Sequence, residues 1–170
     1  MSTNALISFL EVDKGGLIPD ESFTLYVHCD GYPTGMVSMI QKAISFTGNK
    51  KDAFSLASSF IAANRRRNDG GNIRVFPQDK SFDKMLTVAI EWQYEIYREN
   101  HEYFVNVHGW HLKEPTVNWS GRFSDLIMAA TSIEGMANDN AAIHDEDNRT
   151  AGPGEERPAK KPYKWVGILG

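Results

Sequence analysis

Residues 28–33 read HCDGYP, and the turn that they predict decides the fold we expect for the chain. The run before it, Ser22–Cys29, alternates apolar and polar side chains, which is typical of a half-buried β-strand. Pro33 suits the first turn of a helix, because its missing N–H would have no partner there in any case. Apolar residues then recur at helical spacing from Met36 to Ile44. The sequence therefore predicts a strand, a tight turn and a helix.

The segments on either side of this turn predict further strands and helices. An apolar-rich run, Ala5–Val12, predicts a first strand that pairs with Ser22–Cys29 in antiparallel fashion. A second amphipathic helix is expected from Lys51 or Asp52 up to three consecutive arginines. The remaining predicted elements are a strand at Asn72–Phe76, a hairpin of strands at Thr87–Arg98 and Glu102–Val107, and a short helix at Ser120–Met128. Together they predict an α+β fold, with a small antiparallel sheet of about five strands packed against two or three helices.

Composition and charge favour a single domain in a cytoplasmic protein. The chain has 170 residues, which is enough for one domain and an extension. Its formal net charge of −4 excludes a protein that is basic throughout, the usual sign of broad nucleic-acid affinity. Cys29 is the only cysteine and cannot form an intramolecular disulfide, as is common in a reducing cytosol. We find no signal peptide and no apolar run of about 20 residues that could span a bilayer.

The C-terminal part of the chain differs in composition from the rest. Residues 1–132 are predicted to form the globular α+β domain. Residues 133–170 are predicted to form a flexible polar tail, because few apolar side chains are left to offset the entropy of ordering. From Lys160 to Gly170 the tail becomes basic and then apolar. Two interpretations stay open for this terminal segment: it docks on a partner, or it folds back as a last strand of its own sheet.

Residues 25–35, LYVHCDGYPTG, resemble a pattern in phage and prophage accessory proteins of unknown function. In that pattern a strand ending in Tyr-x-His-x-Asp-Gly-Tyr-Pro leads into a helix that begins after a glycine. A later strand alternates Glu and Tyr, as residues 91–96 do here. The resemblance covers residues 5–112, with Cys29 where an aromatic residue is often found and no counterpart of the tail. It implies a viral or mobile-element context, with a location in the host cytoplasm, and not an activity. Small proteins in that context often act by binding and blocking host machinery.

The turn is also the best candidate for a ligand site, through His28, Asp30, Tyr32 and Gly35. Period two places His28 and Asp30 on one face of the strand, pointing toward a helix N-terminus where free N–H groups favour an anion. One interpretation is a phosphate or carboxylate pocket with His28 as hydrogen-bond donor or general acid–base group. In the other, Asp30 caps the turn, His28 is hydrogen-bonded nearby and Tyr32 packs as a plug, which are ordinary uses of these residue types.

The remaining candidates are weaker as sites. Side chains that could contact a partner are Arg65, Arg66, Arg67, Trp110, Tyr163 and Trp165. The arginines could also grip a phosphate backbone, although cations at a helix C-terminus are more often solvated. A metal site would need one polar sheet face to carry Glu91, Glu95, His108 and His28, but no ligand spacing supports it. We find no catalytic signature and no cofactor motif, and His28 and Cys29, as strand neighbours, face opposite ways and form no dyad.

The leading hypothesis is a non-enzymatic protein that binds a host protein complex and antagonises host defence. It rests on the resemblance, on the lack of a catalytic constellation and on the two-part tail. The alternative is a small anionic-ligand or nucleotide-binding protein, or a weak hydrolase, that uses His28 and Asp30. Nucleic-acid contact through the arginines is a lesser hypothesis. We expect no cofactor, no metal and no membrane association, and homo-oligomers remain open.

Overall fold

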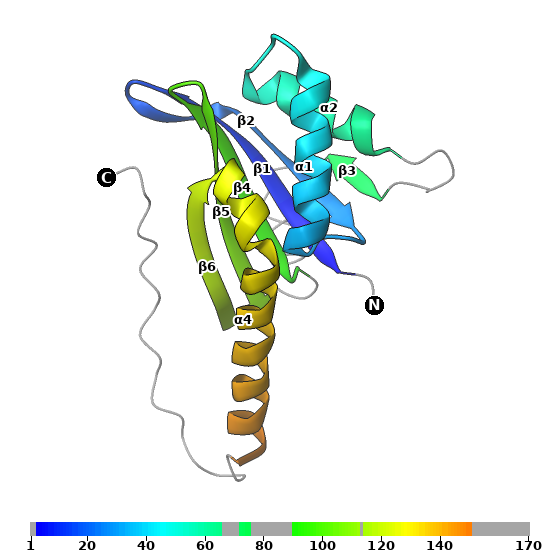
Figure 1. Cartoon of the computed structure of the whole chain (residues 1–170), viewed down its shortest axis with the longest axis vertical. Coiled ribbons are helices and arrows are strands. Elements are labelled where there is room, and N and C mark those ends of the chain that lie inside the picture. Colours follow the sequence, from blue (N-terminus) through cyan, green and yellow to red (C-terminus); the bar gives the residue numbers. More distant parts are fainter. Residues whose placement is uncertain (1–2, 66–71, 76–89, 113, 151–170) are drawn as a thin grey trace.

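The computed structural model describes residues 3–65, 72–75, 90–112 and 114–150 of the chain (Figure 1). In these residues a six-stranded sheet is covered on one face by helices. In chain order the elements are β1 (Asn4–Asp13), β2 (Gly16–His28), α1 (Pro33–Thr47), α2 (Ala53–Asn64), β3 (Ile73–Val75), β4 (Trp92–Glu99), β5 (Glu102–His111), β6 (Glu114–Arg122) and α4 (Phe123–Thr150). The predicted α+β class is confirmed.

The sheet is mixed, with the strand order β3-β2-β1-β4-β5-β6. β1 pairs with β2 in antiparallel fashion, as predicted, and with β4 in parallel fashion on its other side. The structure differs from the expected antiparallel sheet at this one pair. The chain leaves β2 through α1 and α2 and adds β3 in antiparallel fashion at the outer edge of β2. The next described strand, β4, lies on the far side of β1 and runs in the same direction as β1.

Two tight hairpins fix the register of the sheet. In the first, β2 begins at Gly16, well before the predicted strand start at Ser22, because the turn after β1 is short. In the second, Asn100 and His101 join β4 to β5 with φ angles of 47° and 70°, as in a type I′ turn. The hairpin predicted at this place is confirmed.

The hydrophobic core lies between the sheet and the helices. On β1, Ile7 and Phe9 face the helices and are buried. They belong to the same core cluster as Ile40 of α1, Phe60 of α2 and Leu126 of α4. The rings of Phe9 and Phe60 meet edge to face, with centroids 5.5 Å apart. The helices α1, α2 and α4 therefore cover the same face of the sheet (Figure 1).

The C-terminal part differs from the prediction of a short helix at Ser120–Met128 and a tail from residue 133. The chain instead completes β6 and then forms a helix over Phe123–Thr150. Ile133 and Ala137, which follow the predicted boundary, are buried in the core. A helix needs apolar side chains on one face only, so a polar composition did not prevent this segment from packing. The predicted domain boundary therefore falls inside α4.

The second half of α4 also contacts the sheet. Asn140 Nδ2 donates to the carbonyl oxygen of Thr116 at 2.6 Å, and His111 Nε2 lies 3.1 Å from Asp145 Oδ1. These contacts tie the helix to β5 and β6, while its orange end runs beyond the sheet in Figure 1. Residues 151–170, the rest of the predicted tail, lie outside the described residues.

The other predicted elements agree with the structure where it describes them. The helices predicted after Pro33 and near Asp52 are confirmed as α1 and α2, and the strand predicted at Asn72–Phe76 is confirmed as β3. The strand predicted at Thr87–Arg98 begins partly outside the described residues, and β4 starts at Trp92. None of the helices in the described part of the chain has the length and apolar composition needed to cross a membrane.

Candidate functional site

The turn between β2 and α1 has an unusual backbone. Cys29 and Asp30 are consecutive non-glycine residues with φ angles of 76° and 55°, in the left-handed region that L-amino acids rarely occupy. Tyr32 returns to an extended conformation, with φ −71° and ψ 156°, and Pro33 begins α1. Such a backbone persists only where neighbouring contacts hold it. Those contacts define the candidate site.

Gly31 is held between β1 and β4. Its N–H donates to the carbonyl oxygen of Thr3 at 3.1 Å, and its carbonyl oxygen accepts a 2.8 Å hydrogen bond from the hydroxyl of Tyr94. A Cβ atom at this position would lie 2.7 Å from Ala5 Cβ, so glycine alone allows this close approach. Tyr94 is 0% exposed, and its hydrogen bond is therefore shielded from water. The turn is thus fastened to two strands of the sheet.

A carboxylate from α4 occupies the N-terminus of α1. The N–H of Thr34 donates to Glu134 Oε1 at 2.6 Å, whereas the N-cap residue, Tyr32, makes no side-chain capping hydrogen bond. Gly35 packs against the backbone of Asp30. A Cβ atom at position 35 would clash with the carbonyl oxygen of Asp30. The sequence predicts an anion at this helix N-terminus. In the structure the carboxylate of Glu134, from the same chain, takes that position.

His28 lies on the face of the sheet opposite the helices, since it pairs with Asn4 on the outward face of β1. Its Nδ1 atom is 2.8 Å from Asn4 Oδ1 and 3.3 Å from the hydroxyl oxygen of Tyr26. The rings of Tyr26 and His28 stack, with centroids 6.2 Å apart. Asp30 Oδ1 accepts from the hydroxyl of Tyr32 at 3.4 Å, and the Asp30 charge raises the pKa of Tyr32. These hydrogen bonds engage His28 and Asp30 with different neighbours.

Sequence reasoning missed Tyr94 and Glu134 as residues of this site. Tyr94 gave a usable signal, because a buried tyrosine hydroxyl needs a hydrogen-bond partner, but the sequence could not say which one. Glu134 is 100 residues from Thr34 and belongs to a stretch predicted to be tail. No local pattern could have joined it to the turn.

The polar sheet face does not assemble the metal cluster that the sequence raised. β4 pairs with β1 and not with β2, so Glu95 and His108 are separated from His28. Glu95 Oε2 accepts from Asn106 at 3.0 Å, and His108 Nδ1 lies 2.7 Å from Asn118 Oδ1. Among the described residues, no group of three or more His, Cys, Asp or Glu side chains could hold a metal ion.

The predicted partner-binding residues are only partly within the described structure. Arg65 is the exposed C-cap of α2, and its N–H donates to the carbonyl oxygen of Ile61 at 3.0 Å. Trp110 lies on β5, half-buried, and its N–H donates to the carbonyl oxygen of Glu91 at 2.8 Å. The others, Arg66, Arg67, Tyr163 and Trp165, lie outside the described residues.

A surface feature that the sequence did not predict lies on α4. Met128, Met136 and Ile143 are 85%, 47% and 57% exposed. Their spacing of eight and seven residues places them along one stripe of the helix, which flanks the side that carries the buried Leu126 and Ile133. We call Met128, Met136 and Ile143 the outer stripe. Apolar recurrence was visible in the sequence here, but the polar residues around it indicated a tail.

Comparison of the chain with family models, with curated proteins and with solved structures finds no match. The phage-protein resemblance of residues 25–35 stays a prediction. The fold and the site define an α+β protein in which the turn joins the sheet to two helices.

Replacing Tyr94 tests the buried hydrogen bond of the turn. We expect Tyr94→Phe to lower the free energy of unfolding by about 1–3 kcal/mol, because the Gly31 carbonyl oxygen loses its partner inside the protein. Burial raises the pKa of Tyr94 well above its ordinary value of 10.0. The folded state then keeps a proton that the unfolded state releases, so this contribution is complete below pH 10 and declines as the pH rises further.

Urea unfolding from pH 7 to pH 11 measures both effects, since the stability difference between wild type and Tyr94→Phe should shrink above pH 10. Tyr32→Phe, at an exposed tyrosine of the same turn, is the matched control and should change stability by no more than about 0.5 kcal/mol at neutral pH. Equal stability of Tyr94→Phe and wild type at pH 7 would contradict the assignment.

Proposed function

We propose that this chain is a phage or mobile-element accessory protein that binds a host protein complex in the host cytoplasm and inhibits host defence. The resemblance of residues 25–35 supports the origin. The observation that carries the binding function is the outer stripe of α4. This stripe lies on a long helix whose buried side is anchored in the core.

The outer stripe has the chemistry of a helix that docks in a groove. Methionine side chains adapt their shape to a partner surface, and exposed apolar residues on one side of a helix are the usual anchors in such complexes. Residues 123–150 also carry six acidic residues against one arginine, Arg149. The partner that fits is therefore a host protein with an apolar groove rimmed by lysine and arginine, and such charge complementarity speeds the encounter.

The triple variant Met128→Gln, Met136→Gln and Ile143→Gln tests this surface. The melting temperature should stay near that of wild type, because all three side chains are exposed. Affinity capture from a bacterial lysate identifies the partner, and calorimetry with the purified partner measures the dissociation constant. We expect the triple variant to bind at least about tenfold more weakly, since the central apolar anchors dominate such interfaces.

Phe46→Gln is the matched control, because Phe46 is 64% exposed on α1, away from the outer stripe. It should bind with the affinity of wild type. The proposal fails if the triple variant binds the captured partner as tightly as wild type does, or if Phe46→Gln weakens binding equally. If increasing salt abolishes binding but the triple substitution does not, binding is electrostatic, and this result would contradict a role for the outer stripe as the apolar anchor.

The second candidate function is small anionic-ligand or nucleotide binding, or weak hydrolysis, at His28, Asp30, Tyr32 and Gly35. The observation that favours it is the left-handed backbone of Cys29 and Asp30, because strained non-glycine residues cluster at ligand sites. The ring of His28 is exposed, and its contacts with Asn4 and Tyr26 orient it for a role as a donor or general acid–base group.

The variants His28→Ala and Asp30→Ala separate this function from a structural role. Ligand binding predicts that both abolish the binding of a phosphorylated compound from a nucleotide panel while the melting temperature barely changes. Lys42→Ala, at an exposed position of α1, is the control for nonspecific loss of charge. If both turn variants unfold, or if neither changes binding, the turn has a structural role only.

A further inference from the structure

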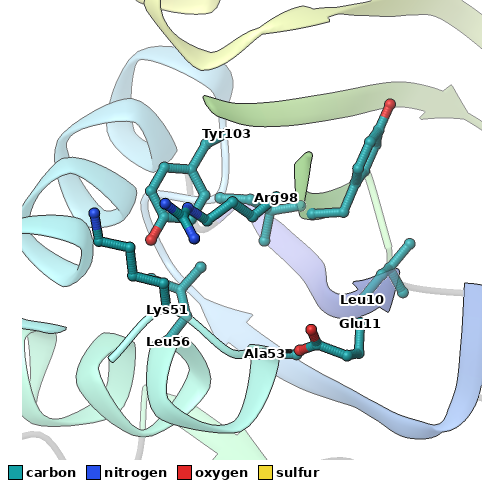
Figure 2. A pocket seen from close by; sticks show the side chains of 9 residues that line it. Leu10, Glu11, Lys51, Ala53, Leu56, Arg98 and Tyr103 are labelled. Carbon is teal, nitrogen blue, oxygen red and sulfur yellow. Dashed lines mark hydrogen bonds between the residues drawn. The ribbon is translucent and has the colours of Figure 1, made fainter. Parts of the chain in front are cut away.

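A pocket lies where the β4–β5 hairpin meets the N-terminus of α2 (Figure 2). Its walls come from the C-terminal ends of β1 and β4, the N-terminal end of β5 and residues 51–56. The pocket therefore lies at the opposite end of the sheet from the His28 turn. Its enclosed part is about 10 Å³, room for one water-sized group such as a single oxygen atom of a ligand, and the rest of the pocket is open to solvent.

The carboxylates at this end of the molecule are already used as helix caps. Glu11 Oε2 accepts from the N–H of Ala53 at 2.7 Å. Asp52 caps α2 through Ser55, whose N–H and hydroxyl both lie 2.8 Å from its oxygens, and these hydrogen bonds lower the pKa of Asp52. In Figure 2 the carboxylate of Glu11 lies beside Ala53 and apart from the labelled basic side chains. Neither acid forms a salt bridge with a cation of the pocket within the described structure.

Two cations line the pocket, and neither has an acidic partner among the residues that the structure describes. They are Arg98 at the end of β4 and Lys51 just before α2. Arg98 Nη2 lies 3.2 Å from Nδ1 of His101. Its Nε atom is buried and has no hydrogen-bond partner in the described structure. A buried guanidinium N–H without an acceptor is costly, and an acceptor entering the pocket would remove that cost.

Tyr103 adds a neutral donor. It stands opposite Arg98 in the β4–β5 pairing and lines the same pocket. Burial raises the pKa of Tyr103, although the charge of Arg98 acts in the opposite direction. The phenol therefore keeps its proton at neutral pH and can donate it in a hydrogen bond. Figure 2 shows the Arg98 and Tyr103 side chains together, with Lys51 reaching up on the same side.

We propose that this pocket binds an oxyanion, a phosphate or carboxylate group, between the guanidinium of Arg98 and the ammonium of Lys51, with the Tyr103 hydroxyl as a third donor. The planar fork of an arginine gives two parallel hydrogen bonds to such a group, and the lysine adds a point charge. An anion that takes the Nε edge of the fork supplies the acceptor that Arg98 lacks. The site is separate from both surfaces of the proposed function and does not depend on them.

Nitrogen-15 NMR of the full chain tests the site through the Arg98 Nε–H signal. Potassium phosphate and sodium acetate are titrated in separate arms, with chloride added to keep the ionic strength constant. We expect a saturable shift of this signal. Saturation by phosphate alone identifies a phosphoryl group, by acetate alone a carboxylate, and by both a site for either oxyanion.

Substitutions show whether the anion is bound where we place it. Lys51→Gln, at an exposed residue, should weaken binding by about tenfold, the effect of losing one charge-assisted hydrogen bond. Arg98→Lys keeps the charge but loses the fork, and it should weaken binding as well. Lys50→Gln is the matched control outside the pocket and should change affinity by no more than about threefold.

Two results would overturn the proposal. One is a shift of the Arg98 signal that grows linearly with either salt and never saturates, which is the behaviour of an adventitious ion only. The other is an equal loss of affinity in Lys50→Gln and Lys51→Gln, which would assign binding to the general charge of this surface. Lys51→Gln keeps the test decisive even if Arg98→Lys does not fold.

Discussion

The buried hydrogen bond from the Tyr94 hydroxyl to the Gly31 carbonyl oxygen is the interaction on which the rest of the structure depends. It joins β4 to the turn that starts α1, while the N–H of Gly31 joins the same turn to Thr3 beside β1. β1 and β4 are the parallel pair at the centre of the sheet, so this hydrogen bond ties the turn to the middle of the sheet. Because the bond is shielded from water, water cannot replace it without opening the core.

The same turn carries the contact between α1 and α4. Glu134 reaches the N–H of Thr34 and neutralises the positive end of the α1 dipole. The left-handed backbone of Cys29 and Asp30 is thus held on three sides, by β1, β4 and α4. These contacts give the turn a structural role as a junction. The outer stripe and the pocket at Arg98 do not hold the elements together in this way, and they are therefore the surfaces at which we expect partners to bind.

Local signals predicted much of the fold, and long-range contacts explain the rest. Pro33 after an alternating strand predicted α1, and the alternation around Asn100 predicted the β4–β5 hairpin, because both depend on neighbouring residues. The parallel β1–β4 pair depends on where a crossover returns, which no short pattern encodes. β6 has Pro115 at its start and a weak alternation, and α4 buries only residues such as Ile133 on one narrow side. At the candidate site the turn itself was predicted. The residues that hydrogen-bond to it lie up to 100 residues away in the sequence, so no local pattern could predict them.

Amide hydrogen exchange at Gly31 tests the central claim most directly, namely that this turn is the junction of the sheet and the helices. If the claim is right, the Gly31 N–H exchanges only when the whole domain unfolds, with the same free energy of opening as the amide of Ile7 in the middle of β1. If Gly31 instead exchanges through local opening at much lower free energy while Ile7 stays protected, the turn is a loop on a fold that is held together elsewhere, and the account is wrong.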